Sequence, residues 1–241
     1  MKKNKKNIII LFFIFYFLLF IFYCLYKQCN FLNIYEKLEL KKETRNAYLL
    51  TCDENSDRAK FSNNILEKIG FNVNIIKCIK NENKVLSNKN SMIYIYELIA
   101  NGNDDWGYVF EDDINILENI DIKEIIEYEK ISDIFFYLGL CVIDSNNDKY
   151  SYLNKKKINN HDVTIIKGNI RGLHSIALSK YGAKELLSFL KNYEDFEYMD
   201  MILEKFSEKY PANVVRFDLE YKNTGHRGIF FQDREQFQTT I

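Results

Sequence analysis

The chain has very little proline and no surplus of charge of either sign. One of its 241 residues is proline and nine are glycine, so the composition excludes a collagen-like array or a low-complexity disordered chain. Lys and Arg number 33 against 34 Asp and Glu, which gives a formal net charge of -1. A nucleic-acid-binding protein needs a basic surplus to neutralise phosphates, so we expect no nucleic-acid partner.

The five cysteines form no Cys-x-x-Cys pair. This excludes the ligand spacing of zinc ribbons and of thioredoxin-like redox sites. Cys24 lies inside an apolar segment and Cys29 lies just beyond it. Cys52, Cys78 and Cys141 fall in or at the end of expected strands, where we expect buried free thiols. The cysteine count by itself leaves the redox compartment open.

One long hydrophobic run lies near the start of the chain. Residues 8–26 carry no charge and are almost all Ile, Leu, Phe and Tyr, and a helix of this length approximately spans a bilayer core. No small-x-small cleavage site follows, which favours an uncleaved signal anchor over a cleaved signal peptide. Lys2, Lys3, Lys5 and Lys6 precede the run. We therefore expect a single-pass membrane protein with a cytoplasmic N-terminus and a lumenal or extracellular domain, in a Golgi- or ER-like compartment for a eukaryotic or viral chain.

The chain divides into a short tail at 1–7, the transmembrane anchor at 8–26, a polar stem at 27–46 and one domain at 47–241. Strand-like and helix-like patterns alternate in that domain. The expected strands are 47–52, 71–79, 106–110, 133–140, 163–166, 173–178 and 214–217. The expected helices are 57–69, 91–101, 120–131, 180–191 and 199–207, with loops at 80–90 and 144–162. This alternation favours an α/β domain with a mostly parallel sheet flanked by helices.

An acidic cluster follows the expected strand at 106–110, and ligands of parallel α/β sheets bind at the carboxyl ends of strands. Glu111, Asp112 and Asp113 are consecutive, and carboxylates this close repel one another unless water or a cation screens them. A hard divalent cation such as Mn²⁺ or Mg²⁺ takes oxygen ligands and relieves the repulsion. Such a cation can also bind both phosphates of a nucleotide diphosphate and stabilise it as a leaving group. The alternative is a solvated acidic turn that caps the next element.

Several segments, in a consistent order from about Ala47 to Arg234, resemble glycosyltransferase family 25, the lipooligosaccharide and procollagen galactosyltransferases. They are the strand at 48–52 with Arg58, the acidic motif at 110–114, the strand at 133–139, the segment at 172–187, Tyr198-Met-Asp200 and the segment at 228–232. The resemblance implies a GT-A-like (Rossmann-like) fold and metal-dependent transfer of a sugar, typically galactose, from a nucleotide donor.

The chain departs from the family at two places. Ser91-Met92 stands where the family usually has a Ser-His pair at a helix start, after a longer stretch, and Thr51-Cys52 stands where the family has Asn-Leu. Either departure is compatible with a changed substrate or with lost activity. The shortened segment before Met92 favours the alternative of a catalytically degenerate domain that binds a glycan or a partner protein without turnover, whereas the intact acidic cluster opposes it. A metal-dependent phosphohydrolase is a third possibility, although no evident nucleophilic aspartate follows Asp113.

The resemblance assigns roles to the acids. Asp113 is the expected principal metal ligand, and Glu111 and Asp112 are expected ribose or metal contacts, with Mn²⁺ or Mg²⁺ as the cofactor. Asp200 is the expected general base, because inversion needs one in-line displacement assisted by a base; a role as N-cap or first-turn acid of a helix is equally open. Gln232 is an expected donor contact on the resemblance alone.

Basic side chains complete the expected site. His174 is either a phosphate or metal contact or a core histidine, and His226 is a candidate metal or diphosphate ligand. Arg227 is a candidate phosphate partner, while Arg58 either reaches the diphosphate or pairs with Asp53. The expected partners are a nucleotide-sugar donor, with UDP-hexose favoured, a glycan or protein acceptor, and the membrane through the N-terminal helix.

Overall fold

The computed structural model describes residues 44–130, 132–141, 155–158, 161–168, 171–193 and 197–237, together with part of the segment 20–27. The chain divides into two units, Met1–Glu43 and Thr44–Ile241. The expected anchor at 8–26 and stem at 27–46 lie mostly outside the described residues. Among the residues that are described, no helix combines the length and the apolar character needed to cross a membrane.

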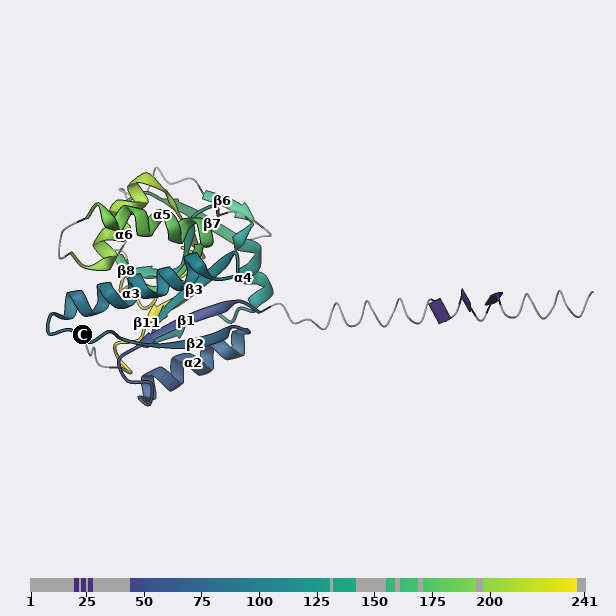
Figure 1. The fold of residues 1–241 in the computed structure, drawn as a ribbon, viewed down its shortest axis with the longest axis horizontal. Helices are drawn as coiled ribbons and strands as arrows, with labels where there is room; N and C mark the ends of the chain where they lie inside the picture. Colours follow the sequence, from purple (N-terminus) through teal and green to yellow (C-terminus); the bar gives the residue numbers. More distant parts are fainter. Residues whose placement is uncertain are drawn as a thin grey trace, which may run out of the picture. The chain divides into compact units, whose positions relative to one another are not determined.

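A mixed sheet lies at the centre of the second unit, and nine of its strands fall within the described residues (Figure 1). Its strands are β1 (Asn46–Thr51), β2 (Asn72–Lys77), β3 (Trp106–Glu111), β5 (Phe135–Cys141), β6 (Lys155–Ile158), β7 (His161–Ile166), β8 (Arg171–Ser179), β9 (Ala212–Val215) and β10 (His226–Gly228). Their order is β2-β1-β3-β8-β5-β9-β7-β6, and β10 pairs with β5. Strands β2, β1, β3, β5 and β9 run in one direction, and β8 lies antiparallel between β3 and β5. The expected α/β class with a mostly parallel central sheet is therefore confirmed.

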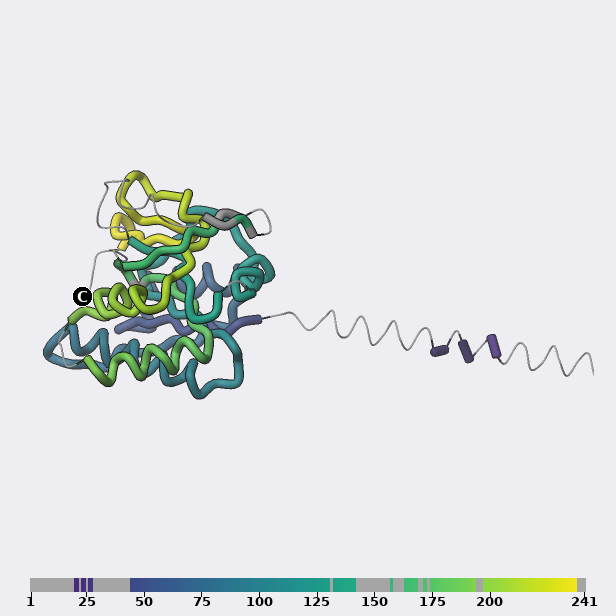
Figure 2. The backbone as a smooth tube through the Cα atoms, turned by 90° about the horizontal axis from the view of Figure 1, so that it is seen from above, coloured from purple at the N-terminus to yellow at the C-terminus, as the bar shows by residue number. Residues whose placement is uncertain are grey.

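Helices cover both faces of this sheet. They are α2 (Asp57–Ile69), α3 (Lys84–Asn101), α4 (Ile122–Glu129), α5 (Lys180–Lys191) and α6 (Met199–Lys209). Successive side chains of a strand point to opposite faces, and in β3 Val109 packs with α3, α5 and α6 while Tyr108 and Phe110 pack with α2 and α4. Figures 1 and 2 show α3, α5 and α6 side by side.

Helix α3 begins earlier than the sequence pattern predicts. Residues 84–90 belong to the helix, whereas we expected a loop over 80–90. The side chain of Asn83 accepts hydrogen bonds from the backbone amides of Val85 (2.9 Å) and Leu86 (3.3 Å). This N-cap satisfies two amides that would otherwise lack partners, so the helix starts in a polar stretch that carries no apolar periodicity.

Short strands also occur where none was expected. Strand β6 lies within the expected loop at 144–162 and pairs antiparallel with β7, which contains the expected strand at 163–166. Strands β4 (Ile114–Ile116) and β11 (Phe230–Gln232) form a separate two-stranded antiparallel sheet. Strands of three or four residues are too short for a periodic apolar pattern, and their pairing depends on segments far apart in the chain.

Cys52 and Cys78 form a disulfide, so the expectation of free thiols at these two positions is wrong. Strands β1 and β2 are parallel neighbours in which Thr51 lies opposite Lys77, so the next residue of each strand faces the other. Their Cα atoms are 4.8 Å apart, within the range that a disulfide requires. Cys141 is a free thiol, as expected, although it is only half-buried.

The segment Ser-Lys-Tyr-Gly-Ala starts α5 and fixes its distance from β5. Ser179 caps the helix, since its Oγ accepts a hydrogen bond from the Gly182 amide (2.9 Å). A Cβ atom at Gly182 would lie 2.1 Å from the backbone oxygen of Ile134. Only glycine therefore fits where the first turn of α5 contacts the start of β5.

We predict that Gly182→Ala destabilises the protein, although helix propensity alone favours alanine by up to about 1 kcal/mol. The clash with the Ile134 oxygen forces the helix away from the sheet, and the free energy of unfolding should fall by about 1–3 kcal/mol. Urea unfolding followed by circular dichroism measures the change. Lys184→Ala, at an exposed position of the same helix, should change stability by no more than about 0.5 kcal/mol. A more stable Gly182→Ala protein would contradict the packing argument.

Candidate active site

A cavity of about 310 Å³ lies at the carboxyl ends of β1 and β3. Its wall includes residues at the ends of β1 and β3, the first turns of α3 and α6, and the end of β11 with the turn that follows it. Among the sequence-predicted site residues, the cavity brings together Arg58, Glu111, Asp112, Asp113, Asp200 and Gln232. These side chains come from four separate regions of the chain, so the tertiary fold assembles one acidic site.

Two neighbouring side chains hold Asp112 in place. Arg58 Nη2, from the first turn of α2, lies 2.5 Å from Asp112 Oδ1 and 3.5 Å from Asp113 Oδ2. Thr51, at the end of β1, donates a hydrogen bond from Oγ1 to Asp112 Oδ2 (2.6 Å). Both carboxylate oxygens of Asp112 therefore have partners, and its charge is largely compensated by the arginine.

Glu111 is held by Gln232 rather than by a cationic side chain. Gln232 Nε2 donates to Glu111 Oε2 (2.7 Å), and the pairing of β11 with β4 brings this glutamine beside the acidic motif. Loss of hydration raises the pKa of Glu111 to about 8, with further contributions from the charges of Asp113, Asp112 and Asp200. In the absence of a cation, Glu111 is therefore mostly protonated at neutral pH.

Asp113 has one carboxylate oxygen without a partner. Its Oδ1 is buried and accepts no hydrogen bond from any described residue, while its Oδ2 faces Arg58. Burial raises the pKa of Asp113, and the positive charge of Arg58 opposes that change. A buried carboxylate oxygen without a partner is costly, and this oxygen is therefore a candidate ligand for a cation in the cavity.

Asp200 lies in the first turn of α6 and lines the same cavity. The residue at the N-cap is Tyr198, whose side chain makes no capping hydrogen bond. Asp200 Oδ1 accepts a hydrogen bond from the neighbouring Met201 amide (2.9 Å). The carboxylate is therefore a first-turn acid that also faces the acidic cluster, close enough for its charge to act on Glu111.

The two candidate histidines pack against each other and do not line the cavity. The rings of His174 and His226 are 5.5 Å apart, and the Nδ1 atoms of both lack a hydrogen-bond partner among the described residues. Burial lowers the pKa of His174 to about 3 and also lowers the pKa of His226, so both rings are neutral at pH 7. Gly172, which does line the cavity, lies against His174, since a Cβ atom there would be 3.0 Å from His174 Nδ1.

The arginine in the cavity wall is Arg234 and not Arg227, the residue suggested by the sequence. Arg227 forms an ion pair with Glu220 (2.5 Å) and donates to the Phe217 carbonyl (3.1 Å), and it does not line the cavity. Arg234, which we did not single out from the sequence, lines the cavity and donates to Gln232 Oε1 (3.0 Å). The sequence signal for Arg234 was its position two residues after Gln232; in the structure it lies in the turn that follows β11.

The acids offer oxygen donors that suit a hard divalent cation. Asp113 Oδ1 is unpartnered among the described residues, and the pKa of Glu111 is raised first by burial and then by the charges of the neighbouring aspartates. Within the described ranges, no group of three His, Cys, Asp or Glu side chains is close enough to hold a metal ion without further ligands. Asp113 and Glu111 are candidate ligands for a cation whose remaining ligands would come from a bound molecule.

Comparison with known proteins adds little to this geometry. No protein-family model matches the chain, and no curated protein matches it. Among solved structures, the apo-form glycosyltransferase GlyE of Streptococcus pneumoniae TIGR4 is similar with a TM-score of 0.34 and 14% identity, over 68% of this chain and 36% of that protein. This chain thus spans about a third of the length of GlyE. A likeness this distant carries no argument about function, which must come from the site.

We predict that Glu111→Gln changes how stability depends on pH in metal-free protein. The pKa of Glu111 is near 4.5 in the unfolded chain and about 8 in the folded chain. Folding therefore takes up a proton at Glu111 between these pH values, and this group's contribution to the free energy of unfolding falls as pH rises through the window. The glutamine does not titrate, so the free energy of unfolding of the variant does not fall in this way. The variant should therefore become more stable relative to wild type as pH rises from about 5 to about 8.

Urea unfolding at several pH values in the presence of EDTA measures this difference. Glu54→Gln, at an exposed position, is the matched control and should follow wild type at every pH. Parallel pH profiles for Glu111→Gln and wild type would show that Glu111 is already ionised in the folded protein.

Proposed function

We propose that this chain is a metal-dependent glycosyltransferase that transfers a hexose, such as galactose, from a nucleotide-diphosphate donor to a glycan or protein acceptor. The observation that carries this proposal is the cavity at the carboxyl end of β3, where three consecutive acids meet Asp200 and two arginines. The family 25 resemblance of the same segments supports the reaction class. UDP-hexose is the favoured donor.

The charges of the cavity suit a diphosphate that arrives with a divalent cation. Asp113 and Glu111 supply the protein ligands, and His226 is a further candidate ligand that would have to approach the cavity. When bound, Mn²⁺ or Mg²⁺ would neutralise the negative charge that develops on the diphosphate leaving group. Arg234 lines the cavity and donates a hydrogen bond to the neutral Gln232 side chain, so we propose that its guanidinium contacts phosphate oxygens directly.

Asp200 is the residue that we propose as general base. Its carboxylate lines the same cavity as the acidic motif but comes from a different helix, α6. In an inverting transfer, the acceptor hydroxyl gives its proton to this carboxylate while its oxygen bonds to the anomeric carbon. The bond between that carbon and the diphosphate oxygen breaks, and the nucleoside diphosphate leaves with the electron pair.

We further propose that the domain lies on the lumenal or extracellular side of a membrane, anchored by residues 8–26. The Cys52–Cys78 disulfide supports this location. Disulfides persist in oxidising compartments and are rare where glutathione and thioredoxin keep thiols reduced. The lysines before the hydrophobic run favour the same orientation.

The purified full chain should hydrolyse or transfer sugar from one or more nucleotide-sugar donors only when Mn²⁺ or Mg²⁺ is present. Asp113→Asn should lower turnover on the order of 100-fold, because it removes the charge of the expected ligand. Asp105→Asn is the matched control, since Asp105 is exposed and precedes the opposite end of β3. It should leave turnover unchanged.

Other outcomes of the donor screen would point to other functions. Cation-dependent binding of a nucleotide sugar without turnover would identify a catalytically degenerate binding module. Release of inorganic phosphate without any sugar acceptor would identify a phosphohydrolase. A chain that binds no nucleotide sugar under any condition would rule out the transferase proposal altogether.

Arg234→Gln should raise the KM for the donor on the order of tenfold, because it removes a charge-assisted contact with phosphate. Arg227→Gln should leave the KM near the wild-type value, because the Arg227 guanidinium is already paired with Glu220 outside the cavity. Steady-state kinetics of the two variants measure the contrast. The opposite ranking would support Arg227, the sequence-based candidate, as the phosphate contact.

A further inference from the structure

The Cys52–Cys78 disulfide forms part of the cavity wall. Thr51, the residue before Cys52, holds Asp112 through its hydroxyl group. The Cys78 amide donates a hydrogen bond to the Thr51 carbonyl (2.8 Å). The disulfide therefore joins the end of β1, which supports the acidic cluster, to the end of β2. The segment that follows β2 forms another part of the cavity wall.

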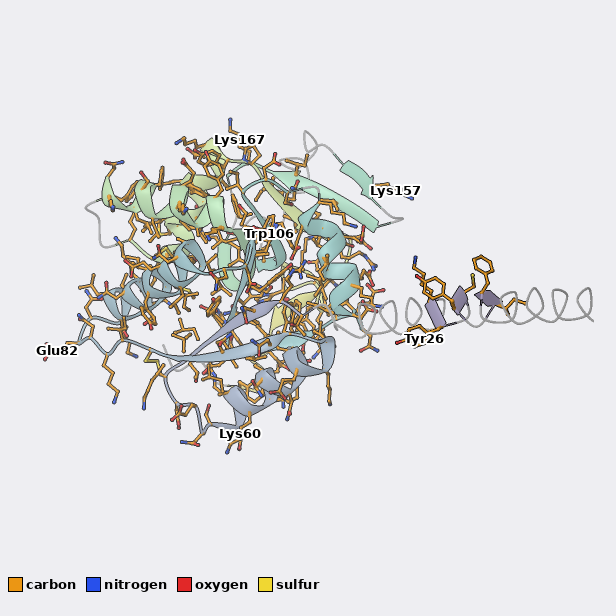
Figure 3. All side chains as sticks on the ribbon, turned by 45° about the vertical axis from the view of Figure 1, so that its right-hand side comes forward. Tyr26, Lys60, Glu82, Trp106, Lys157 and Lys167 are labelled. Carbon is orange, nitrogen blue, oxygen red and sulfur yellow. A yellow bond between two sulfur atoms is a disulfide. The ribbon has the colours of Figure 1, made fainter. Side chains whose placement is uncertain are left out.

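This part of the wall is a mostly polar segment whose side chains are exposed or only half-buried. It runs from residue 79 to residue 88, through the turn after β2 and the first turn of α3. Its cavity-lining members are Asn81, Lys84, Ser87 and Asn88. Residues 79–84 are exposed and 85–88 are half-buried, and Figure 3 shows Glu82 at the outer edge of the domain. Segments with few buried contacts open at low free-energy cost.

The hydrogen bonds at the start of this wall connect it to α3. The Ile79 amide donates to Ser91 Oγ (2.8 Å), and Ser87 Oγ donates to the Ile79 carbonyl (2.7 Å). From Ser91 onward α3 is anchored in the core, where Met92 and Ile95 are fully buried. The covalent bond at Cys78 is therefore the strong tie between this segment and the end of β1.

We propose that the Cys52–Cys78 disulfide is a redox-sensitive clamp that holds the wall at 79–88 in place, and that its reduction loosens this wall and weakens nucleotide binding. The part that concerns nucleotide rests on the proposed function. In the step itself, a dithiol such as dithiothreitol supplies two electrons and two protons. The S–S bond breaks to two thiols, and the dithiol is oxidised to its cyclic disulfide. Cys52 is exposed, so the reductant can reach the bond.

Hydrogen–deuterium exchange of the full chain tests the clamp without any ligand. Reduction should accelerate amide exchange in residues 79–88 by about tenfold or more, while the core strand β5 keeps its protection. The double variant Cys52→Ser/Cys78→Ser should exchange at the reduced rate and should not respond to the dithiol. Cys141→Ser removes the other described cysteine of this domain and should retain the full wild-type response.

Two exchange results would overturn the clamp. Exchange in 79–88 that does not change on reduction would show that the wall is held by other contacts. Equal acceleration in 79–88 and in β5 would show that the disulfide stabilises the whole domain and does not hold this wall specifically. Both outcomes are read from the wild-type chain, so they do not depend on whether the double variant folds.

Calorimetric titration with UDP and Mn²⁺ tests the consequence for binding. The Kd for UDP should rise about tenfold on reduction of wild type, and the double variant should show the weaker Kd with or without dithiol. Equal UDP affinity in the oxidised and reduced protein would overturn the link to binding. If oxidised wild type binds no UDP, the proposed function fails, while the exchange experiment still decides the clamp.

Discussion

Repulsion among the carboxylates that follow β3 is the constraint on which the rest of the site depends. Three acids in consecutive positions meet Asp200 in one cavity, and the fold compensates them unequally. Arg58 and Thr51 satisfy Asp112, and a neutral amide from Gln232 contacts Glu111. One oxygen of Asp113 is left without a partner. A bound cation would give this oxygen a partner and would relieve the repulsion that an ionised Glu111 meets from the neighbouring aspartates.

The scaffold achieves this by bringing distant segments to one edge of the sheet. Glu111 and Gln232 are 121 positions apart in the chain, and the short β4–β11 sheet places them 2.7 Å apart. The two cavity arginines differ in their surroundings: Arg58 is buried and paired with acids, whereas Arg234 is exposed. One arginine therefore stabilises the acidic cluster, and the other is accessible to a ligand.

Elements with strong local signals agreed closely with the sequence pattern. Helix α2 spans the expected residues and ends at Gly70, whose φ of 113° is a left-handed conformation that favours glycine. Helix α5 also has its expected bounds, because Ser179 caps it and apolar residues recur along one side. Helix α3 began a full two turns early, because a cap by Asn83 leaves no apolar signal. Short strands such as β11 were missed for a related reason, since three residues show no periodicity.

The sequence by itself determined the α/β class, most of the longer elements and the place of the acidic motif at a strand end, because alternation, capping and glycine geometry act within a few residues. Only the tertiary structure decided which side chains meet. It paired Cys52 with Cys78, placed Arg234 in the cavity wall and left Arg227 bound to Glu220. The disulfide depends on β1 and β2 lying side by side in register, and the cavity wall near Arg234 depends on β11 pairing with the distant β4. Strand order and pairing decide both, and no local window of sequence contains that information.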